Sequence, residues 1–256
     1  MSALRIGIAG LGTVGASTVQ LLEQHAKMIQ SRVGQAVDVT AISARSKTID
    51  RGFALDSYRW FDDPVEMTTD SDIDVIVELI GGSDGIAKAL VEKGLANGKH
   101  VVTANKALIA HHGAELACIA EKAGVGFYGE AAVAGGIPIL KAIREGLAGN
   151  AINRVYGILN GTCNYILSEM RDTGRTFDDV LEEAQKLGYA EADPTFDVDG
   201  IDAAHKLTIL AGLCWHQGRF RESPHRGHSQ YFAARFGIRR RTRLWHQAAR
   251  HRVAHR

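Results

Sequence analysis

The chain has 256 residues, of which 45% are hydrophobic and 23% charged, and its formal net charge is +1. This composition is typical of a globular protein, and no apolar run is long enough to span a bilayer, which excludes a membrane-spanning protein. The chain enters a strand pattern at once, without a secretory signal. The three cysteines lack CxxC spacing and predict reduced thiols in a cytoplasmic protein.

The first predicted elements are a strand at Leu4–Ala9 and a helix that ends near His25. Between them stands a GxGxxG turn, and this context predicts dinucleotide binding. Its three glycines permit, in order, a sharp turn, close approach of the pyrophosphate and close packing of helix on strand. The helix N-terminus favours the negative charge of the pyrophosphate. The residues expected to bind the cofactor here are Gly10, Gly12, Thr13, Val14 and Gly15.

A second strand is predicted at residues 36–42 from its β-branched content. Enzymes that use NAD usually carry an acid at the end of this strand, which binds the ribose 2′-hydroxyl. Here the chain continues without a carboxylate, and Arg45 and Lys47 could bind a 2′-phosphate. An ordinary basic loop is the alternative. The sequence therefore favours NADP as cofactor over NAD, and both remain open.

Three further strands are predicted at 74–80, 100–104 and 126–129, with helices at 87–96 and 107–123 between them. This alternation predicts a Rossmann-type α/β fold with a doubly wound parallel sheet. Ligands bind at the carboxyl ends of such strands. The residues that fall at those ends include the glycine turn, Gly81-Gly82, Lys106 and Glu130.

Small residues and glycines surround one carboxylate at residues 130–138, which we interpret as a hinge. It would separate a nucleotide-binding domain, 1–130, from a second, α+β substrate and dimerisation domain, 131–213. The second domain is predicted to hold helices at 139–147, 165–172 and 180–187, and a strand at 152–159. An acidic loop then leads to a last helix that begins near Asp199.

The acidic loop and the last helix form a second candidate site. Five carboxylates lie between Glu191 and Asp202, and Asp202 and Lys206 are four residues apart on one helix face. A solvated loop with one ion pair would explain this pattern. A pocket for a cationic substrate would also explain it, with Lys206 as proton carrier, because a lysine can do acid–base work in a suitable environment.

Six motifs, taken together and in order, resemble those of the homoserine dehydrogenases over about residues 4–213. They are the glycines at 10–15, Glu78-Leu79-Ile80-Gly81-Gly82, Thr103-Ala104-Asn105-Lys106, Asn160-Gly161-Thr162-Cys163-Asn164-Tyr165, Gly188-Tyr189-Ala190-Glu191-Ala192-Asp193-Pro194 and the segment from Asp199 to Lys206. The resemblance implies an oxidoreductase that interconverts L-aspartate 4-semialdehyde and L-homoserine with NAD(P)H, on the route to threonine, isoleucine and methionine. It also implies a homodimer formed by the second domains.

The same resemblance implies roles for single residues. Lys206 would exchange a proton with the substrate oxygen, and Asp202 would position it. Glu191 would bind the substrate ammonium, Asp197 would line the same pocket, and Lys106 would lie near the nicotinamide and the substrate. A monovalent cation, expected to be Na⁺, would be held by hard oxygen donors. The positions implied for this cation are Glu130, Val133, Gly135 and Ile137.

Two other functions remain open. A different NAD(P)-dependent semialdehyde dehydrogenase would need a cysteine nucleophile, for which Cys163 is the candidate. A nucleic-acid-binding protein would use the basic segment 214–256. That segment has eleven arginines, no lysine and one acid, so its net charge is +10 and residues 1–213 carry −9. Binding to nucleic acid or to a membrane is not expected.

The basic segment 214–256 shows neither helical nor strand periodicity, and it resembles the product of a shifted reading frame. A G+C-rich gene read out of frame yields Arg, His, Ala and Gly. Read from the second base of permitted codons, residues 224–252 can encode a run containing Glu-Leu-Gly-Tyr-Gly-Ile-Lys-Leu-Leu-Gly, which resembles the family's sequence. We therefore predict a disordered tail, an incomplete second domain with uncovered apolar faces, and a chain that is unstable or inactive as written.

Overall fold

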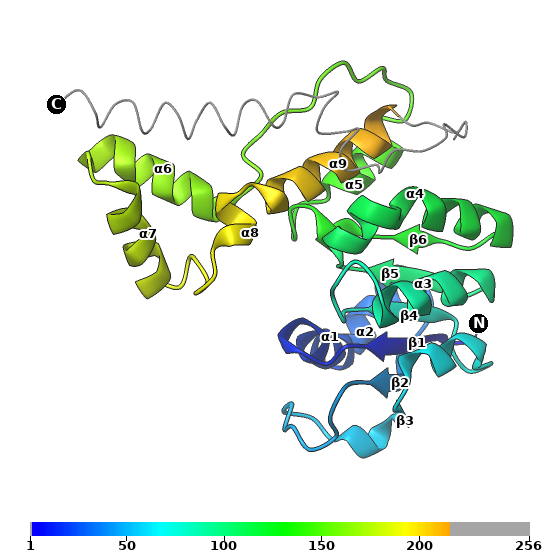
Figure 1. Cartoon of the computed structure of the whole chain (residues 1–256). Helices are drawn as coiled ribbons and strands as arrows, with labels where there is room; N and C mark the ends of the chain where they lie inside the picture. The colour runs from blue at the N-terminus through cyan, green and yellow to red at the C-terminus, as the bar shows by residue number, and fades with distance from the viewer. Residues whose placement is uncertain (1, 216–256) are drawn as a thin grey trace. The chain divides into compact units, whose positions relative to one another are not determined.

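The computed structural model describes residues 2–215. The predicted disorder of residues 216–256 therefore lies outside the described residues. The chain divides into two compact units, Met1–Ala142 and a second that begins at Ile143, and each is described by itself (Figure 1). The domain boundary expected at residue 130 lies within the first unit.

The first unit is built on a six-stranded parallel sheet, which confirms the predicted Rossmann-type fold. The strand order is β3-β2-β1-β4-β5-β6, so the direction of winding reverses between β1 and β4. Ligands of such sheets bind at the carboxyl ends of the strands beside this reversal. The strands are β1 Leu4–Ala9, β2 Val37–Ser43, β3 Arg59–Phe61, β4 Val75–Glu78, β5 His100–Thr103 and β6 Phe127–Tyr128.

Two apolar layers hold helices against the sheet, because successive strand residues point to opposite faces. In one layer, Ile8 of β1 and Ile42 of β2 are buried with Val19 of the first helix. In the other, Ile76 of β4 is buried with apolar side chains of the third and fourth helices. The four helices are α1 Thr13–Gln24, α2 Ala26–Val33, α3 Ile86–Ala96 and α4 Lys106–Ala123. Short 3₁₀ turns lie at Leu55–Ser57 and Pro64–Thr69.

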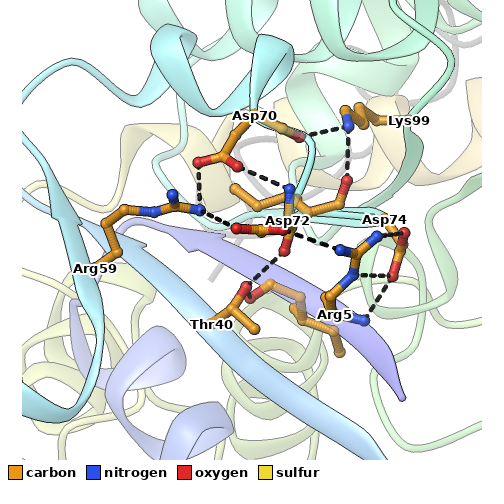
Figure 2. A network of polar contacts seen from close by, with 9 residues as sticks. Arg5, Thr40, Arg59, Asp70, Asp72, Asp74 and Lys99 are labelled. Carbon is orange, nitrogen blue, oxygen red and sulfur yellow. Dashed lines mark hydrogen bonds and ion pairs between the residues drawn. The ribbon is translucent and has the colours of Figure 1, made fainter. Parts of the chain in front are cut away.

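A network of charged side chains closes the amino end of the sheet (Figure 2). The Nε and terminal nitrogen of Arg5 donate to the two oxygens of Asp74, at 2.9 and 2.7 Å. Lys99 donates to the carbonyls of Asp70 and Ile73, at 2.6 and 2.7 Å. The hydrogen bond from Arg5 lowers the pKa of Asp74 to about 2. The charged groups at the amino ends of the strands are thus paired within the protein. They lie at the opposite end of the sheet from the expected ligand site.

The chain leaves the sheet through a succession of short turns. A 3₁₀ turn spans Glu130–Ala132, and the helix α5 covers only Ile139–Lys141 before it continues as a π-helical turn, Ala142–Gly146. The helix predicted at 139–147 is thus split into two short pieces. Glycine is a poor helix former, and Gly146 ends the second piece.

The described part of the second unit is helical. Ile166 is buried against Val180 and Ala184, which packs two of its helices together. Thr176 caps the second of them, because its hydroxyl accepts a hydrogen bond from the N–H of Asp179. The helices are α6 Gly161–Thr173, α7 Phe177–Lys186, α8 Thr195–Val198 and α9 Ile201–Trp215. The last includes Cys214 and Trp215, which the sequence places in the basic segment.

The prediction of a strand at residues 152–159 is wrong, because the structure has neither helix nor strand between 151 and 160. Tyr156 and Ile158, which suggested a strand, are 85% and 77% exposed. A strand requires backbone hydrogen bonds from a neighbouring strand, and the second unit has no strand among the residues described. The apolar pattern is therefore present here without a partner strand.

Candidate active site

The glycine turn has the geometry that a pyrophosphate requires. Gly10 has φ +97°, and a Cβ on Gly15 would lie 1.9 Å from the carbonyl oxygen of Gly10. A Cβ on Gly12 would instead meet no atom within 4 Å. Gly12 is also the N-cap of α1 and offers no side-chain acceptor, while Thr13 and Val14 behind it are exposed. Backbone N–H groups at this helix end can therefore bind an anion.

Arg51 ties the loop after β2 to this turn, a contact that the sequence did not predict. Its Nε donates to the carbonyl of Leu11 at 3.0 Å. Its two terminal nitrogens donate to the carbonyls of Ile49 and Ser46, at 2.9 and 2.8 Å. The two loops that border the carboxyl ends of β1 and β2 are thus joined by one guanidinium.

The two residues predicted to meet a 2′-phosphate differ in their surroundings. Arg45 is exposed directly after β2. The ammonium of Lys47 lies 5.1 Å from the centroid of the Trp60 ring, so it makes a cation–π contact. Both side chains are exposed at this edge of the sheet, and Lys47 is in contact with Trp60.

Glu78 organises the carboxyl ends of β4 and β5. It is fully buried, and one carboxylate oxygen accepts hydrogen bonds from the N–H groups of Ile80 and Gly81, at 2.8 and 3.1 Å. The other accepts a hydrogen bond of 2.5 Å from the hydroxyl of Thr103. This buried carboxylate thus fixes the turn that follows β4.

Asn105 completes this arrangement beside Lys106. Its Nδ2 donates to the carbonyl of Gly82 at 2.6 Å, and its Oδ1 caps α4 by accepting from the N–H of Leu108 at 3.1 Å. Lys106 is the first residue of α4 and is half-buried. The start of α4 is therefore held at the carboxyl edge of the sheet, where a cofactor would bind.

The stretch implied for a monovalent cation offers only oxygen donors. The two carboxylate oxygens of Glu130 accept hydrogen bonds from the N–H groups of Leu140 and Lys141, each at 2.9 Å. Ala134 and Gly136 have φ values of +53° and +85°, so the backbone is left-handed at both residues. One carboxylate and backbone carbonyls suit a hard cation. Within residues 2–215, no group of three His, Cys, Asp or Glu side chains could hold a metal ion.

In the second unit, Asp202 and Lys206 form a close ion pair on one face of α9. The Nζ of Lys206 lies 2.7 Å from Oδ2 of Asp202 and donates to the carbonyl of Leu159 at 2.8 Å. The side chain of Asp202 is only 3% exposed, against 21% for Lys206. A lysine ammonium has three N–H donors, so these acceptors leave one for another group.

Asp197 belongs to the same polar network. Its Oδ1 accepts from Nδ2 of Asn160 at 2.8 Å, and the same amide nitrogen lies 3.0 Å from Oδ2 of Asp202. The hydroxyl of Thr162 lies 2.9 Å from the other oxygen of Asp197. The structure thus brings Asp197, Asp202 and Lys206 together. Asn160 and Thr162, for which no role was predicted, connect them.

Glu191 lies outside this network. Its side chain is exposed, and Nε2 of Gln185 donates to its backbone carbonyl at 3.0 Å. Its carboxylate is therefore accessible to a ligand from solvent.

Cys163 has the environment of a neutral thiol. Its Sγ donates to the carbonyl of Asp197 at 3.1 Å. Burial raises the pKa of this thiol, and the charges of Asp197 and Asp202 raise it further. Because the thiolate is the nucleophilic form, these surroundings disfavour Cys163 as a nucleophile.

The fold and these residues define a class: a dinucleotide-binding α/β protein with a lysine–carboxylate pair in a second unit. Comparison with known proteins gives the family. Residues 10–130 match the homoserine dehydrogenase NAD binding domain, and residues 138–231 match the homoserine dehydrogenase domain. The chain belongs to the homoserine dehydrogenase family.

The similar proteins agree with this assignment. A homoserine dehydrogenase of Pseudomonas aeruginosa is 56% identical over 217 residues, which are 84% of this chain and 49% of that protein. The crystal structure of one from Thiobacillus denitrificans has a TM-score of 0.78 at 49% identity, over 90% of this chain and 53% of the other. A hyperthermophilic archaeal homoserine dehydrogenase in complex with NADPH has a TM-score of 0.73 at 29% identity, over 84% and 70%.

The chain spans about half the length of the curated relatives that it matches. Among the helices described, none is both long and apolar enough to cross a membrane.

Proposed function

We propose that the chain carries the site of a homoserine dehydrogenase, which interconverts L-homoserine and L-aspartate 4-semialdehyde with a nicotinamide dinucleotide. The contact between Lys206 and Asp202, at 2.7 Å, carries this proposal. It supplies an acid–base group in the second unit, while the glycine turn supplies a dinucleotide site in the first. Family membership makes this reaction the best match to both.

Lys206 acts as the proton donor and acceptor at the substrate oxygen. Asp202 and the carbonyl of Leu159 take two of its N–H donors, so the third is directed to the substrate. The buried carboxylate of Asp202 keeps the ammonium in place between turnovers. The nicotinamide, when bound, supplies or accepts the hydride.

The carboxylates of the acidic loop select a cationic substrate. Glu191, which is exposed, binds the α-ammonium. Asp197 is tied by Asn160 and Thr162, so it lines the pocket as a fixed negative charge. Lys106, at the start of α4, supplies a positive charge near the cofactor and the substrate.

The cofactor is NADP or NAD, with NADP favoured. Its pyrophosphate binds at the start of α1, and Arg45 binds the 2′-phosphate. A monovalent cation, Na⁺, binds at Glu130, Val133, Gly135 and Ile137, because this stretch offers oxygen donors alone. The protein is a cytoplasmic homodimer that works in threonine, methionine and isoleucine biosynthesis. Nucleic-acid binding by the basic segment 214–256 is disfavoured by the family assignment.

A shifted reading frame after Leu213 would leave the chain, as written, unstable or inactive. The experiment therefore tests the reading frame and the activity together. The gene is sequenced around the codon for Leu213, and the chain is assayed beside a version whose frame is restored there. The restored protein is expected to oxidise L-homoserine with NADP⁺, and to be much less active on 4-hydroxybutyrate, which lacks the ammonium. No oxidation of L-homoserine by the restored protein would refute the proposed function. Equal activity of both versions would refute the frame shift.

A further inference from the structure

One side-chain amide joins two carboxylates of the second unit, the half-buried Asp197 and the buried Asp202. Nδ2 of Asn160 lies 2.8 Å from Oδ1 of Asp197 and 3.0 Å from Oδ2 of Asp202. Oδ1 of the same amide accepts a hydrogen bond from the N–H of Cys163, at 2.8 Å, and so caps α6. The oxygen has to face that donor, which fixes the orientation of the amide. Both of its N–H donors therefore face carboxylates.

The charges of this cluster explain why a neutral donor is needed. Asp197 and Asp202 carry two negative charges, and Lys206 is the ammonium hydrogen-bonded to Asp202. The amide of Asn160 satisfies one oxygen of each carboxylate without adding charge. Like charges brought close together would otherwise push the two carboxylates apart.

The same short segment also holds Lys206 directly. Oδ2 of Asp202 accepts from both Lys206 and Asn160, while the carbonyl of Leu159 accepts another N–H of Lys206. The carbonyl of Leu159 thus restrains the ammonium directly, and Asn160 restrains it through Asp202. A shift of Asp202 would release the ammonium from its position.

We propose that Asn160 is a positioning residue, which holds Asp197 and Asp202 together and thereby fixes the direction of the Lys206 ammonium. This inference rests on the proposed function only in assigning proton transfer to Lys206. The effect of Asn160 on the position of the Lys206 ammonium can be tested without measuring turnover.

Two variants of the full chain separate the cap that Asn160 forms on α6 from its contacts with Asp197 and Asp202. Asn160→Asp keeps an oxygen that can cap α6 but replaces the amide donors with a third carboxylate. Asn160→Ala removes the cap and the contacts with both carboxylates, without adding charge. Thr176→Ala is the matched control, since Thr176 caps the neighbouring helix α7 in the same unit and has no contact with Asp197 or Asp202 among the described residues.

The readout is the ¹H–¹⁵N NMR signal of the Lys206 side-chain ammonium, assigned with Lys206→Arg. Both Asn160 variants are expected to shift this signal and to speed exchange of its protons with water about tenfold, as for loss of a charge-assisted hydrogen bond. Thr176→Ala is expected to leave both unchanged. An unchanged signal in Asn160→Asp, or an equal change in Thr176→Ala, would overturn the proposal.

Failure of the proposed function gives a different result. If the proposed function is wrong, Lys206→Ala turns over normally in the frame-restored enzyme. The Asn160 variants would still change the NMR signal of the Lys206 ammonium. If the function holds, Asn160→Asp lowers kcat and leaves the KM for NADPH unchanged, because the dinucleotide site lies in the first unit.

Discussion

Arg51 donates a hydrogen bond from Nε to the carbonyl of Leu11, 40 residues earlier in the chain, at 3.0 Å. Leu11 lies inside the glycine turn, so the guanidinium joins that turn to the loop after β2. Both loops border the proposed site for the adenosine half of the cofactor.

Arg51→Lys is therefore expected to weaken NADPH binding about tenfold, because Arg51 reaches the three carbonyls with three nitrogens spread over a planar guanidinium, a spacing that one ammonium nitrogen cannot reproduce. Isothermal titration calorimetry measures this directly. Arg154→Lys, an exposed arginine of the second unit, is the control. Equal NADPH affinities for the two variants would remove Arg51 from the cofactor site.

The glycine turn allows binding to be separated from folding. Gly12→Asp is expected to fold normally and to lose NADPH binding, because a Cβ at Gly12 meets no protein atom within 4 Å and the added carboxylate would occupy the place of the pyrophosphate. Gly15→Ala is expected to destabilise the first unit, since its Cβ would lie 1.9 Å from the carbonyl oxygen of Gly10. Chemical denaturation and calorimetry on both variants check the pair. NADPH affinity retained in Gly12→Asp would contradict the site.

The pair formed by Arg5 and Asp74 predicts a dependence of stability on acid. The pKa of Asp74 is lowered to about 2 by Arg5, from an ordinary value of 3.8, so the pair stabilises the fold above pH 3.8 and this contribution is lost as the pH falls through 2. The side chain of Asp74 is one-third exposed, so we expect about 1 kcal/mol after allowance for solvent screening. Urea unfolding of Asp74→Asn at pH 7 should show this loss.

Asp56→Asn, at an exposed aspartate in the turn Leu55–Ser57, is the control for that measurement. The difference between wild type and Asp74→Asn should shrink as the pH is lowered towards 2. A difference independent of pH would show that the charge of Asp74 is not responsible.

Local sequence patterns predicted those elements whose determining residues lie close together in the chain. Leu4–Ala9 has the apolar run of a buried strand, and Gly10 behind it adopts the positive φ that a sharp turn uses. The spacing of Asp202 and Lys206 predicted a contact because both stand on one helix. In each case the determinant lies within a few residues.

The remaining features depend on contacts between distant parts of the chain. The strand β3 has three residues, too few to show an alternating pattern, and it forms because β2 pairs with it. The segment 152–159 has a strand-like composition but no partner strand in the part of the unit that is described. Likewise, Asn160 and Asp197 are 37 residues apart, and only the packing of α6 near α8 brings them together.

The central claim is that Lys206 exchanges the proton with the substrate oxygen. The most direct measurement compares turnover of L-homoserine by Lys206→Ala and Lys186→Ala in the frame-restored enzyme. Lys186 also pairs with a carboxylate four residues away, at 2.6 Å from Glu182, but its side chain is 71% exposed on α7. We predict a loss of ~10²–10⁴-fold in kcat for Lys206→Ala, with unchanged NADPH affinity, and nearly normal turnover for Lys186→Ala. Equal turnover in the two variants would contradict the claim.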